Sequence, residues 1–334
     1  MSSETDYQAN NQWFGEMLRG YAPNIDQGLV TVLASISNAC SNISRHLWTA
    51  DGEAKAGSSN TYGDEQLDID LYADKTVFDH LRATGKISVA ASEENPTEVQ
   101  MGGKGYSVAF DPLDGSSIID SNFAVGSIFG VWDSTHLLGK TGRDQSASCI
   151  AVYGPRTHLA IALNGKVTEG EAVAFDLILK PEDGVWAISK KVLTIAPAGK
   201  VFAPGNLRAT SDNLHYKALF DHWVNERYTL RYTGGMVPDV YYSLIKGKGV
   251  FVNVPSPTAP AKLRLLYECA PVSLLVEAAG GLSIALTSMG IPPITGVLHP
   301  VSVLDVLMDD MDSRLGVCFG GKSEVETAVR FLFP

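Results

Sequence analysis

The chain has 334 residues, of which 45% are hydrophobic and 19% are charged, a composition typical of a globular protein with one large domain or two. The formal net charge of -11 argues against a nucleic-acid-binding protein, because a phosphate backbone requires a basic surface. No apolar run is long enough to span a membrane, so we expect a soluble protein without a membrane partner.

The N-terminal residues have neither the basic start of a signal peptide nor the Arg-rich character of a transit peptide. This favours a cytoplasmic protein; a plastid protein whose transit peptide has been removed is the alternative. Four cysteines lie far apart and form no Cys-x-x-Cys pair: Cys40, Cys149, Cys269 and Cys318. Such spacing predicts reduced, buried thiols instead of a disulfide framework or a zinc site.

The first half of the chain mixes helices with short strands. Apolar residues at helical spacing predict helices over 28–47 and 66–84, with a Gly- and Ser-rich loop over 51–63 between them. Apolar runs predict strands at 87–91, 106–110, 124–132, 149–153 and 159–163.

The second half begins near residue 200 and has the same mixed character. Helices are predicted from Asp212 or Asn213 to Trp223, from Pro238 to Leu244, and over 269–279, where Gly280 ends the helix. Strands are predicted over 250–254 and 262–266. We therefore expect a layered α/β or α+β fold of two halves, 1–195 and 196–334, with a cleft between them.

Residues 111–117 read Asp-Pro-Leu-Asp-Gly-Ser-Ser and are the most informative segment. Pro112 favours a turn that aims the carboxylates of Asp111 and Asp114 at one point. The amides of Gly115, Ser116 and Ser117 can then face an anion. Carboxylates beside anion-binding amides make chemical sense when cations lie between them, as in a metal-bridged phosphate. An ordinary surface turn is the alternative interpretation.

Other acidic residues occur at the ends of predicted elements. They are Asp64, Asp68, Glu93, Glu94 and Glu268. Gathering these carboxylates in one cleft raises several pKa values unless divalent cations compensate, and hard oxygen ligands favour Mg²⁺ or Mn²⁺ over zinc. The alternative is that each acidic side chain is simply solvated.

A basic counterpart lies in the second half. On the predicted strand 262–266, Lys262 and Arg264 fall on one face, which suits a bound phosphate, although a solvated strand face is the simpler explanation. Arg231 and Tyr232 precede a glycine turn. Asn213 and Tyr216 share a helix face by their spacing of three residues. Together these side chains suit a second phosphate, and each can also be structural.

The order and spacing of these segments resemble the fructose-1,6-bisphosphatase and sedoheptulose-1,7-bisphosphatase family from about residue 28 to the C-terminus. The resemblance rests on the segments Gly63-Asp64, Leu67-Asp68, Ser92-Glu-Glu94, Asp111-Pro-Leu-Asp-Gly-Ser-Ser117 and Lys262-Leu-Arg-Leu-Leu-Tyr-Glu268. It implies stacked α-β-α-β-α layers with the active site between the halves. Any single segment is a weak signal, whereas the combination is highly specific.

The resemblance also implies roles for individual residues. Two or three Mg²⁺ or Mn²⁺ ions per site would be held by Asp64, Glu93, Asp111, the Leu113 carbonyl, Asp114 and Glu268. Glu94 and Asp68 would orient and deprotonate the attacking water. The phosphate that is cleaved would contact Gly115, Ser116, Ser117 and Arg264. The distal phosphate would contact Asn213, Tyr216, Arg231, Tyr232 and Lys262, and Asn253 stands where the fructose branch often has a tyrosine. Arg231 would reach in from a neighbouring subunit, which implies a homodimer or tetramer.

The amino-acid sequences of several segments are similar to those of the sedoheptulose branch, notably Pro204-Gly-Asn-Leu-Arg-Ala-Thr210 and Ile150-Ala-Val-Tyr-Gly-Pro-Arg-Thr157. The implied activity is hydrolysis of the 1-phosphate of sedoheptulose 1,7-bisphosphate, by direct in-line attack of water, in Calvin cycle or pentose phosphate metabolism. A fructose-1,6-bisphosphatase or a dual-specificity enzyme is the alternative, and an inactive sugar-phosphate sensor is the alternative from another class. Residues 52–59 contain no cysteine, so the plant-type thioredoxin switch is expected to be absent.

Overall fold

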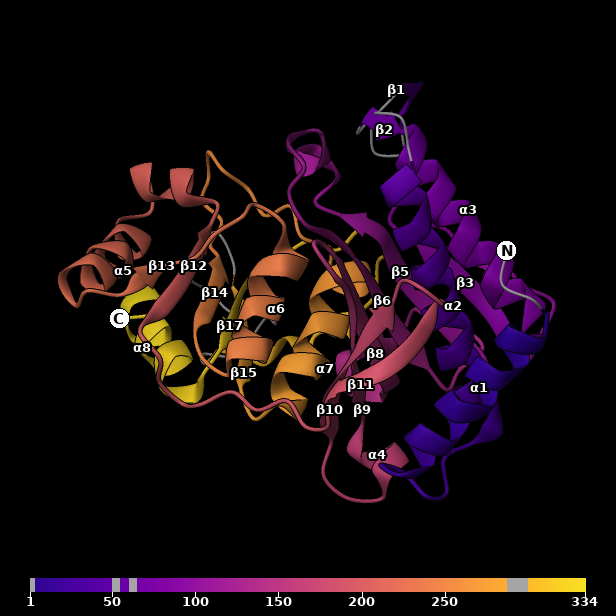
Figure 1. Cartoon of the computed structure of the whole chain (residues 1–334). Coiled ribbons are helices and arrows are strands. Elements are labelled where there is room, and N and C mark those ends of the chain that lie inside the picture. The colour runs from indigo at the N-terminus through magenta and orange to yellow at the C-terminus, as the bar shows by residue number, and fades with distance from the viewer. Residues whose placement is uncertain (1–3, 50–54, 60–64, 287–299) are drawn as a thin grey trace.

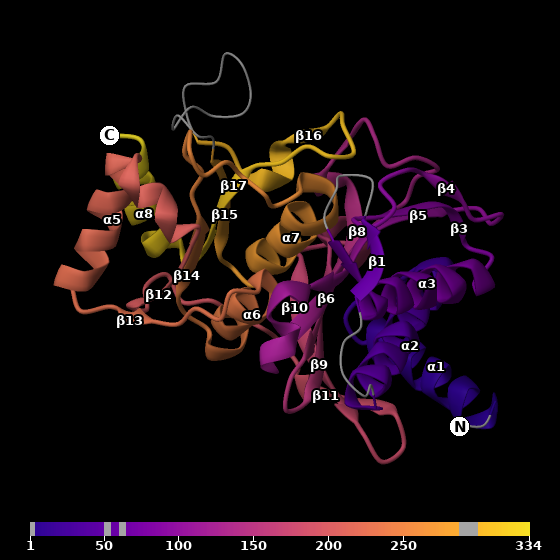
Figure 2. The same cartoon turned by 90° about the horizontal axis from the view of Figure 1, so that it is seen from above.

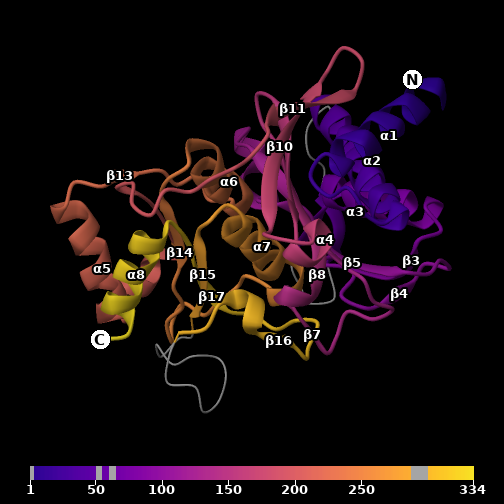
Figure 3. The same ribbon diagram turned by 90° about the horizontal axis from the view of Figure 1, so that it is seen from below.

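The computed structural model describes residues 4–49, 55–59, 65–286 and 300–334. Figures 1, 2 and 3 show five alternating layers of helices and sheets. The helices are α1 (Glu4–Arg19), α2 (Gln27–Thr49), α3 (Asp68–Ala83), α4 (Gly165–Thr168), α5 (Leu214–Asn225), α6 (Met236–Lys246), α7 (Ala270–Ala278) and α8 (Lys322–Leu332). The predicted α-β-α-β-α architecture is confirmed.

A large sheet of eight strands forms the second layer, in the order β11-β10-β9-β8-β6-β5-β3-β4. Its strands are β3 (Ile87–Ser92), β4 (Val99–Gln100), β5 (Tyr106–Asp114), β6 (Val125–Trp132), β8 (Gln145–Tyr153), β9 (Thr157–Leu163), β10 (Val173–Lys180) and β11 (Val185–Lys190). Every residue of β5, β6 and β8 is buried. Their nearly continuous apolar sequences follow from coverage of both faces by helices.

A smaller sheet of five strands forms the fourth layer, in the order β13-β12-β14-β17-β15. Its strands are β12 (Val201–Gly205), β13 (Thr229–Leu230), β14 (Val250–Asn253), β15 (Leu282–Leu286) and β17 (Gly316–Gly320). Strand β12 is parallel to both β13 and β14. Two short ladders complete the described strands: β1 (Lys55–Ser59) with β2 (Glu65–Leu67), and β7 (Lys140–Thr141) with β16 (Leu307–Met308).

Three apolar cores hold the layers together. Helices α1, α2 and α3 pack on one face of the large sheet. Helices α6 and α7 lie between the two sheets, and α5 and α8 cover the outer face of the small sheet. The helix predicted over 28–47 is confirmed as α2, whose residues Leu29, Val32, Leu33, Ile36, Cys40 and Ile43 are all buried.

Some sequence predictions were wrong in detail. The loop predicted over 51–63 contains strand β1, and the helix predicted from residue 66 begins at Asp68 because residues 65–67 pair as β2. The four cysteines are free thiols and buried, as predicted. Among the described residues, no helix combines the length and the apolar character that crossing a membrane requires.

Candidate functional site

Three predicted metal ligands meet at one point, although they come from both halves of the chain. One carboxylate oxygen from each of Glu93, Asp111 and Glu268 lies within 4.8 Å of the other two. Glu93 follows β3, Asp111 lies in β5, and Glu268 lies in a π-helical turn before α7. The side chains of Asp111 and Glu268 are buried. The cluster therefore lies at the junction of the large sheet with the layer of α6 and α7.

The Asp111–Asp114 segment is a bulged strand and not the predicted turn at Pro112. Strand β5 continues to Asp114, with a register shift against β6 between Asp111 and Asp114. The Leu113 amide donates to Asp111 Oδ1 at 2.9 Å, so the carboxylate substitutes for a lost strand contact. Pro112 is compatible with this strand because it lies in the bulge. The bulge, instead of a turn, directs both acids toward one side.

A buried hydroxyl pair supports this bulge from behind. The Ser127 hydroxyl donates to the Pro112 carbonyl at 2.7 Å and lies 2.8 Å from the Tyr153 hydroxyl. Because a serine has one hydroxyl proton, the Tyr153 hydroxyl is the donor in the second bond. Both side chains are buried. Two strands of the large sheet therefore fix the backbone next to Leu113, whose carbonyl is a predicted metal ligand.

Asp114 is held by the other half of the molecule. The amides of Met236 and Val237, at the start of α6, donate to its two carboxylate oxygens at 3.3 Å and 2.6 Å. The positive end of a helix favours a carboxylate at this place. Burial is nevertheless the larger effect and raises the pKa of Asp114 to about 6.

The other acids of the cluster also hold protons more tightly than usual. Burial raises the pKa of Asp111, and the charges of Asp114 and Glu268 raise it further. Burial likewise raises the pKa of Glu268 to about 7, against the opposing bond from the Arg264 amide. A divalent cation bound among these oxygens would relieve both the burial penalty and the mutual repulsion. The donor set, all carboxylate oxygens, fits Mg²⁺ or Mn²⁺.

The segment around Arg264 differs from the predicted strand over 262–266. Arg264 forms an isolated bridge with Arg314, and Leu265–Cys269 then form the π-helical turn. The wide turn lets the Arg264 amide donate to Glu268 Oε2 at 2.6 Å. The alternating sequence predicts two cations on one face, yet Lys262 is exposed and Arg264 is 3% exposed.

The buried Arg264 guanidinium joins the acidic cluster directly. Its Nη1 forms an ion pair with Glu93, and its Nε lies 3.3 Å from Asp312 Oδ1. A buried cation of this kind is tolerated because it is paired. The predicted contact of Arg264 with the phosphate that is cleaved stays a prediction, and its position beside Glu93 is compatible with it.

The Glu93–Glu94 pair sits in a tight turn fixed at both ends. The Ser92 amide donates to the Asn95 carbonyl at 3.1 Å, and the Asn95 amide donates to the Ser92 hydroxyl at 2.9 Å. Asp74 of α3 accepts a hydrogen bond from the Ser92 side chain, and burial raises the pKa of Asp74 to about 6. The charge of Glu94 raises this pKa further, which places Glu94 near Asp74.

The two remaining predicted acids, Asp64 and Asp68, are not seen at the cluster. Asp64 lies outside the described residues. Asp68 is exposed at the first position of α3, whereas Asp70 in the same turn is 3% exposed. Asp70 shares the buried face of α3 with Ala73 and Val77, three and seven residues later. This helical spacing was the signal that could have identified Asp70 as the inward-facing acid.

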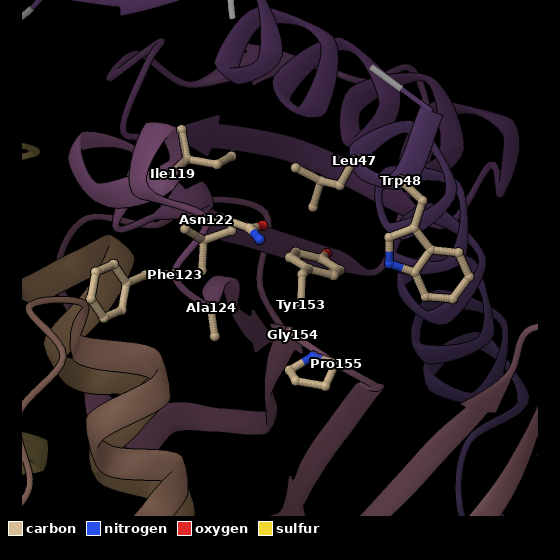
Figure 4. A pocket seen from close by; sticks show the side chains of 10 residues that line it. Leu47, Trp48, Ile119, Asn122, Phe123, Ala124, Tyr153, Gly154 and Pro155 are labelled. Atoms are coloured by element: carbon tan, nitrogen blue, oxygen red, sulfur yellow. The ribbon is translucent and has the colours of Figure 1, made fainter. Parts of the chain in front are cut away.

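Gly115, Ser116 and Ser117 open a short 3-10 helix, Ser116–Ser121, directly after Asp114. Gly115 has φ 85°, in the left-handed region that favours glycine. Behind this helix lies a cavity of about 270 Å³, shown in Figure 4. Its lining includes Leu47, Trp48, Ile119, Phe123 and Tyr153.

The predicted distal-phosphate residues lie mostly at the ends of the parallel strands. Arg231 and Tyr232 follow β13 and are exposed, and Asn253 ends β14. Lys262 is also exposed. Arg208, to which the sequence motifs assign no role, is an exposed cation in the 3-10 helix Leu207–Ser211 that follows β12. The carboxyl ends of parallel strands are common ligand-binding positions, and the position of Arg208 after β12 therefore indicates a candidate ligand-binding residue.

Asn213 and Tyr216 have structural tasks in this arrangement. The Asn213 side chain caps α5 by accepting from the Tyr216 amide at 3.0 Å. The Tyr216 ring is fully buried and its hydroxyl donates to the Gly205 carbonyl at 2.8 Å. Their predicted phosphate contacts stay predictions, and that of Tyr216 requires its buried hydroxyl to be uncovered.

Comparison with known proteins agrees with this arrangement across almost the whole chain. The family profile for the fructose-1-6-bisphosphatase N-terminal domain matches residues 18–191, and that for the C-terminal domain matches residues 195–333. The chloroplastic sedoheptulose-1,7-bisphosphatase of Spinacia oleracea is 45% identical over 305 residues, which is 90% of this chain and 73% of that protein.

Two further relatives extend the comparison. A class 1 fructose-1,6-bisphosphatase of Citrifermentans bemidjiense is 34% identical over 315 residues, 93% of this chain and 89% of that protein. The crystal structure of a candidate sedoheptulose-1,7 bisphosphatase from Toxoplasma gondii superimposes with a TM-score of 0.84 at 38% identity, covering 95% of this chain and 97% of that one. The chain therefore belongs to the fructose-1,6-bisphosphatase family.

Proposed function

We propose that the chain is a metal-dependent sugar bisphosphatase that removes the 1-phosphate of sedoheptulose 1,7-bisphosphate. The observation that carries this proposal is the convergence of Glu93, Asp111 and Glu268 from both halves of the chain. The sedoheptulose-1,7-bisphosphatase of Spinacia oleracea supports this choice of sugar.

We further propose that Glu93, Asp111, Asp114, Glu268 and the Leu113 carbonyl hold Mg²⁺ or Mn²⁺, with Asp64 from outside the described residues. When bound, two or three such ions supply the positive charge that phosphoryl oxygens and a leaving alkoxide require.

The protein's own groups orient the reactants. Glu94 and Asp70 orient the attacking water, and Glu94 accepts its proton; Asp70 takes this place in the proposal instead of the exposed Asp68. The Gly115, Ser116 and Ser117 amides and the Arg264 guanidinium bind the phosphate that is cleaved, and the serine hydroxyls are not nucleophiles. Water thus attacks phosphorus in line while the bond from phosphorus to the sugar oxygen breaks, and the sugar leaves as an alkoxide that takes up a proton, without a phosphoenzyme.

The central experiment compares kcat/KM for sedoheptulose 1,7-bisphosphate and fructose 1,6-bisphosphate in magnesium. We expect the seven-carbon substrate to be preferred. A preference for the six-carbon substrate, or equal use of both, would support the second candidate, a fructose or dual-specificity enzyme, which the Citrifermentans bemidjiense relative favours.

The variant Glu94→Gln separates an enzyme from an inactive sensor. It should lose about 100-fold or more of kcat, as is typical for removal of a general base, while product binding stays within threefold. Reaction in ¹⁸O-labelled water should place the label directly in phosphate. A wild-type protein that binds the sugar phosphate without releasing phosphate would be a sensor.

We also propose a homo-oligomer, with Arg231 reaching the site of a neighbouring copy. Exposed apolar side chains flank that arginine in the sequence, with Leu230 52% and Tyr232 46% exposed, and others follow the adjacent strand β12, with Leu207 40% and Leu214 72% exposed. A patch of this kind on the outer edge of the small sheet suits a second copy of the chain. Light scattering after size exclusion should give a dimer or tetramer, and a monomeric mass at assay concentration would contradict this. A cytoplasmic location stays a prediction.

A further inference from the structure

The segments that follow three adjacent strands of the small sheet form a surface, and the sequence motifs assign a function to only some of its residues. Strand β12 lies between β13 and β14 and is parallel to both, so all three run toward the same edge; β12 and β14 end side by side at Gly205 and Asn253, and β13 ends opposite Phe202, three residues earlier. Arg231 and Tyr232 leave this edge from β13, and Asn253 ends β14. The middle strand leads into Asn206 and Arg208, and no function was predicted for either.

The side chain of Arg208 is oriented by a built hydrogen-bond network. Asn206 has φ 52°, and its Nδ2 donates to the carbonyls of Val254 and Ala259, each at 2.9 Å. These two bonds fix the amide so that its Oδ1 accepts from Arg208 Nε at 3.0 Å. The guanidinium is thus anchored at Nε, which leaves its two terminal nitrogens as donors.

Arg208 is an exposed cation that has no ion-pair partner among the described residues. Within the part of the chain that the structure describes, no Asp or Glu forms an ion pair with it. A planar guanidinium with two free terminal nitrogens matches two phosphate oxygens. An oriented but unpaired cation of this kind suits a dianionic ligand better than a solvated surface position.

Tyr232 connects Arg208 with the acidic cluster. Burial raises the pKa of the Tyr232 hydroxyl, and the charges of Asp239 and Asp114 raise it further, whereas the charge of Arg208 lowers it. Tyr232 therefore lies within electrostatic reach of Asp114 on one hand and of Arg208 on the other.

Two of the predicted distal-phosphate residues also make structural contacts of their own. Tyr216 is buried with its hydroxyl on Gly205, and Asn213 caps α5. We propose that Arg208 binds the distal phosphate of the sugar bisphosphate, from the carboxyl end of the middle strand β12. This inference rests on the proposed bisphosphatase function and names a residue that determines how its substrate is held.

The test uses the full-length protein and two product inhibitors. Sedoheptulose 7-phosphate carries only the distal phosphate, and we expect inorganic phosphate, as the released product, to bind at the site of the phosphate that is cleaved. In Arg208→Gln, the inhibition constant for sedoheptulose 7-phosphate should rise about 10- to 100-fold, which corresponds to loss of a charge-assisted contact. The constant for inorganic phosphate should stay within twofold.

Kinetics provide a second readout. KM for the bisphosphate should rise by a similar factor with kcat changed less than threefold, because the contact is made in both the ground state and the transition state. Arg208→Lys keeps the charge but loses the planar pair of donors, so it should recover part of the loss. The matched control is Arg330→Gln, which removes an exposed cation on α8 and should leave both constants unchanged.

Two outcomes would overturn the inference. One is an Arg208→Gln variant that binds sedoheptulose 7-phosphate as tightly as the wild type. The other is an equal weakening of sedoheptulose 7-phosphate and inorganic phosphate, which would mean a general disturbance of the site. If the wild-type protein hydrolyses no sugar bisphosphate at all, the proposed function fails instead, so the two failures are distinguishable.

Discussion

Replacement of Gly126 by alanine tests whether the packing of β6 against α6 supports the proposed metal centre. A Cβ at this position would lie 2.4 Å from Val237 Cγ1 and 2.5 Å from the Ala151 carbonyl oxygen, and the latter belongs to the backbone and cannot rotate away. Gly126 also pairs directly with Asp114 across the strands. The added methyl group must therefore push α6 away at Val237, whose amide donates to Asp114.

The magnitude follows from this geometry. Overpacking of a tight core costs about 1–3 kcal/mol of unfolding free energy. Unfolding entropy is about 2.1 cal/mol/K per residue, so a chain of 334 residues should lose about 1.5–4 °C in Tm. Displacement of a group that orients a metal ligand typically weakens metal affinity about 10-fold or more.

Calorimetry would measure Tm, and Mn²⁺ titration followed by electron paramagnetic resonance would measure metal affinity directly. Gly170→Ala is the matched control, because a Cβ there meets no atom within 4 Å, and both quantities should stay at the wild-type values. A lower Tm with unchanged Mn²⁺ affinity in Gly126→Ala would refute the link between α6 and Asp114. Wild-type values of both would refute the packing argument itself.

Three further predictions follow from the acids and hydroxyls around the cluster. Asp70→Asn should lower kcat about 100-fold or more in a phosphate-release assay, whereas Asp68→Asn should stay within threefold; equal losses would contradict the assignment of Asp70. In EDTA-treated protein, burial raises the pKa of Glu268 to about 7 and that of Asp114 to about 6, so the folded state binds more protons than the unfolded state. Urea unfolding should therefore show stability that rises as pH falls from about 7 toward 5, and saturating Mg²⁺ should reverse this trend; a flat metal-free profile would argue against the raised pKa values. Tyr153→Phe removes a buried hydroxyl donor behind the metal-binding segment, at a cost of about 1–2 kcal/mol, and should raise the Mg²⁺ concentration needed for half-maximal activity. An unchanged Mg²⁺ requirement would show that this hydroxyl does not position the segment.

The fold was predictable where one face of an element is apolar. Helix α2 follows from its 3.6-residue periodicity, and the buried strands of the large sheet follow from short apolar runs. The strand predicted over 262–266 was wrong, because charged and apolar residues alternate there in a pattern that is compatible with a strand. A π-helical turn follows Arg264, and the side chain of Arg264 forms a buried ion pair with Glu93, 171 residues away in the chain; no local pattern indicates such a partner.

The candidate site was predictable as a set of residue types and less so as geometry. The acids Glu93, Asp111 and Glu268 were identified before their convergence was visible. The inward-facing acid of α3 was missed, although its spacing to the apolar residues of that helix contained the information. The proposed role of Arg208 depends on strand order in the small sheet, which a single sequence does not specify.

The acidic cluster draws on residues that leave the ribosome at very different times. Glu93 and Asp111 emerge early, whereas Glu268 and the α6 amides that donate hydrogen bonds to Asp114 emerge only when most of the chain has been translated. If these residues hold the metal as proposed, a nascent chain cannot bind the cation with the full set of ligands, and hydrolysis should begin only after synthesis is nearly complete. A stalled chain that ends before Glu268 should retain no Mn²⁺ on desalting, and retention would show that the early acids suffice.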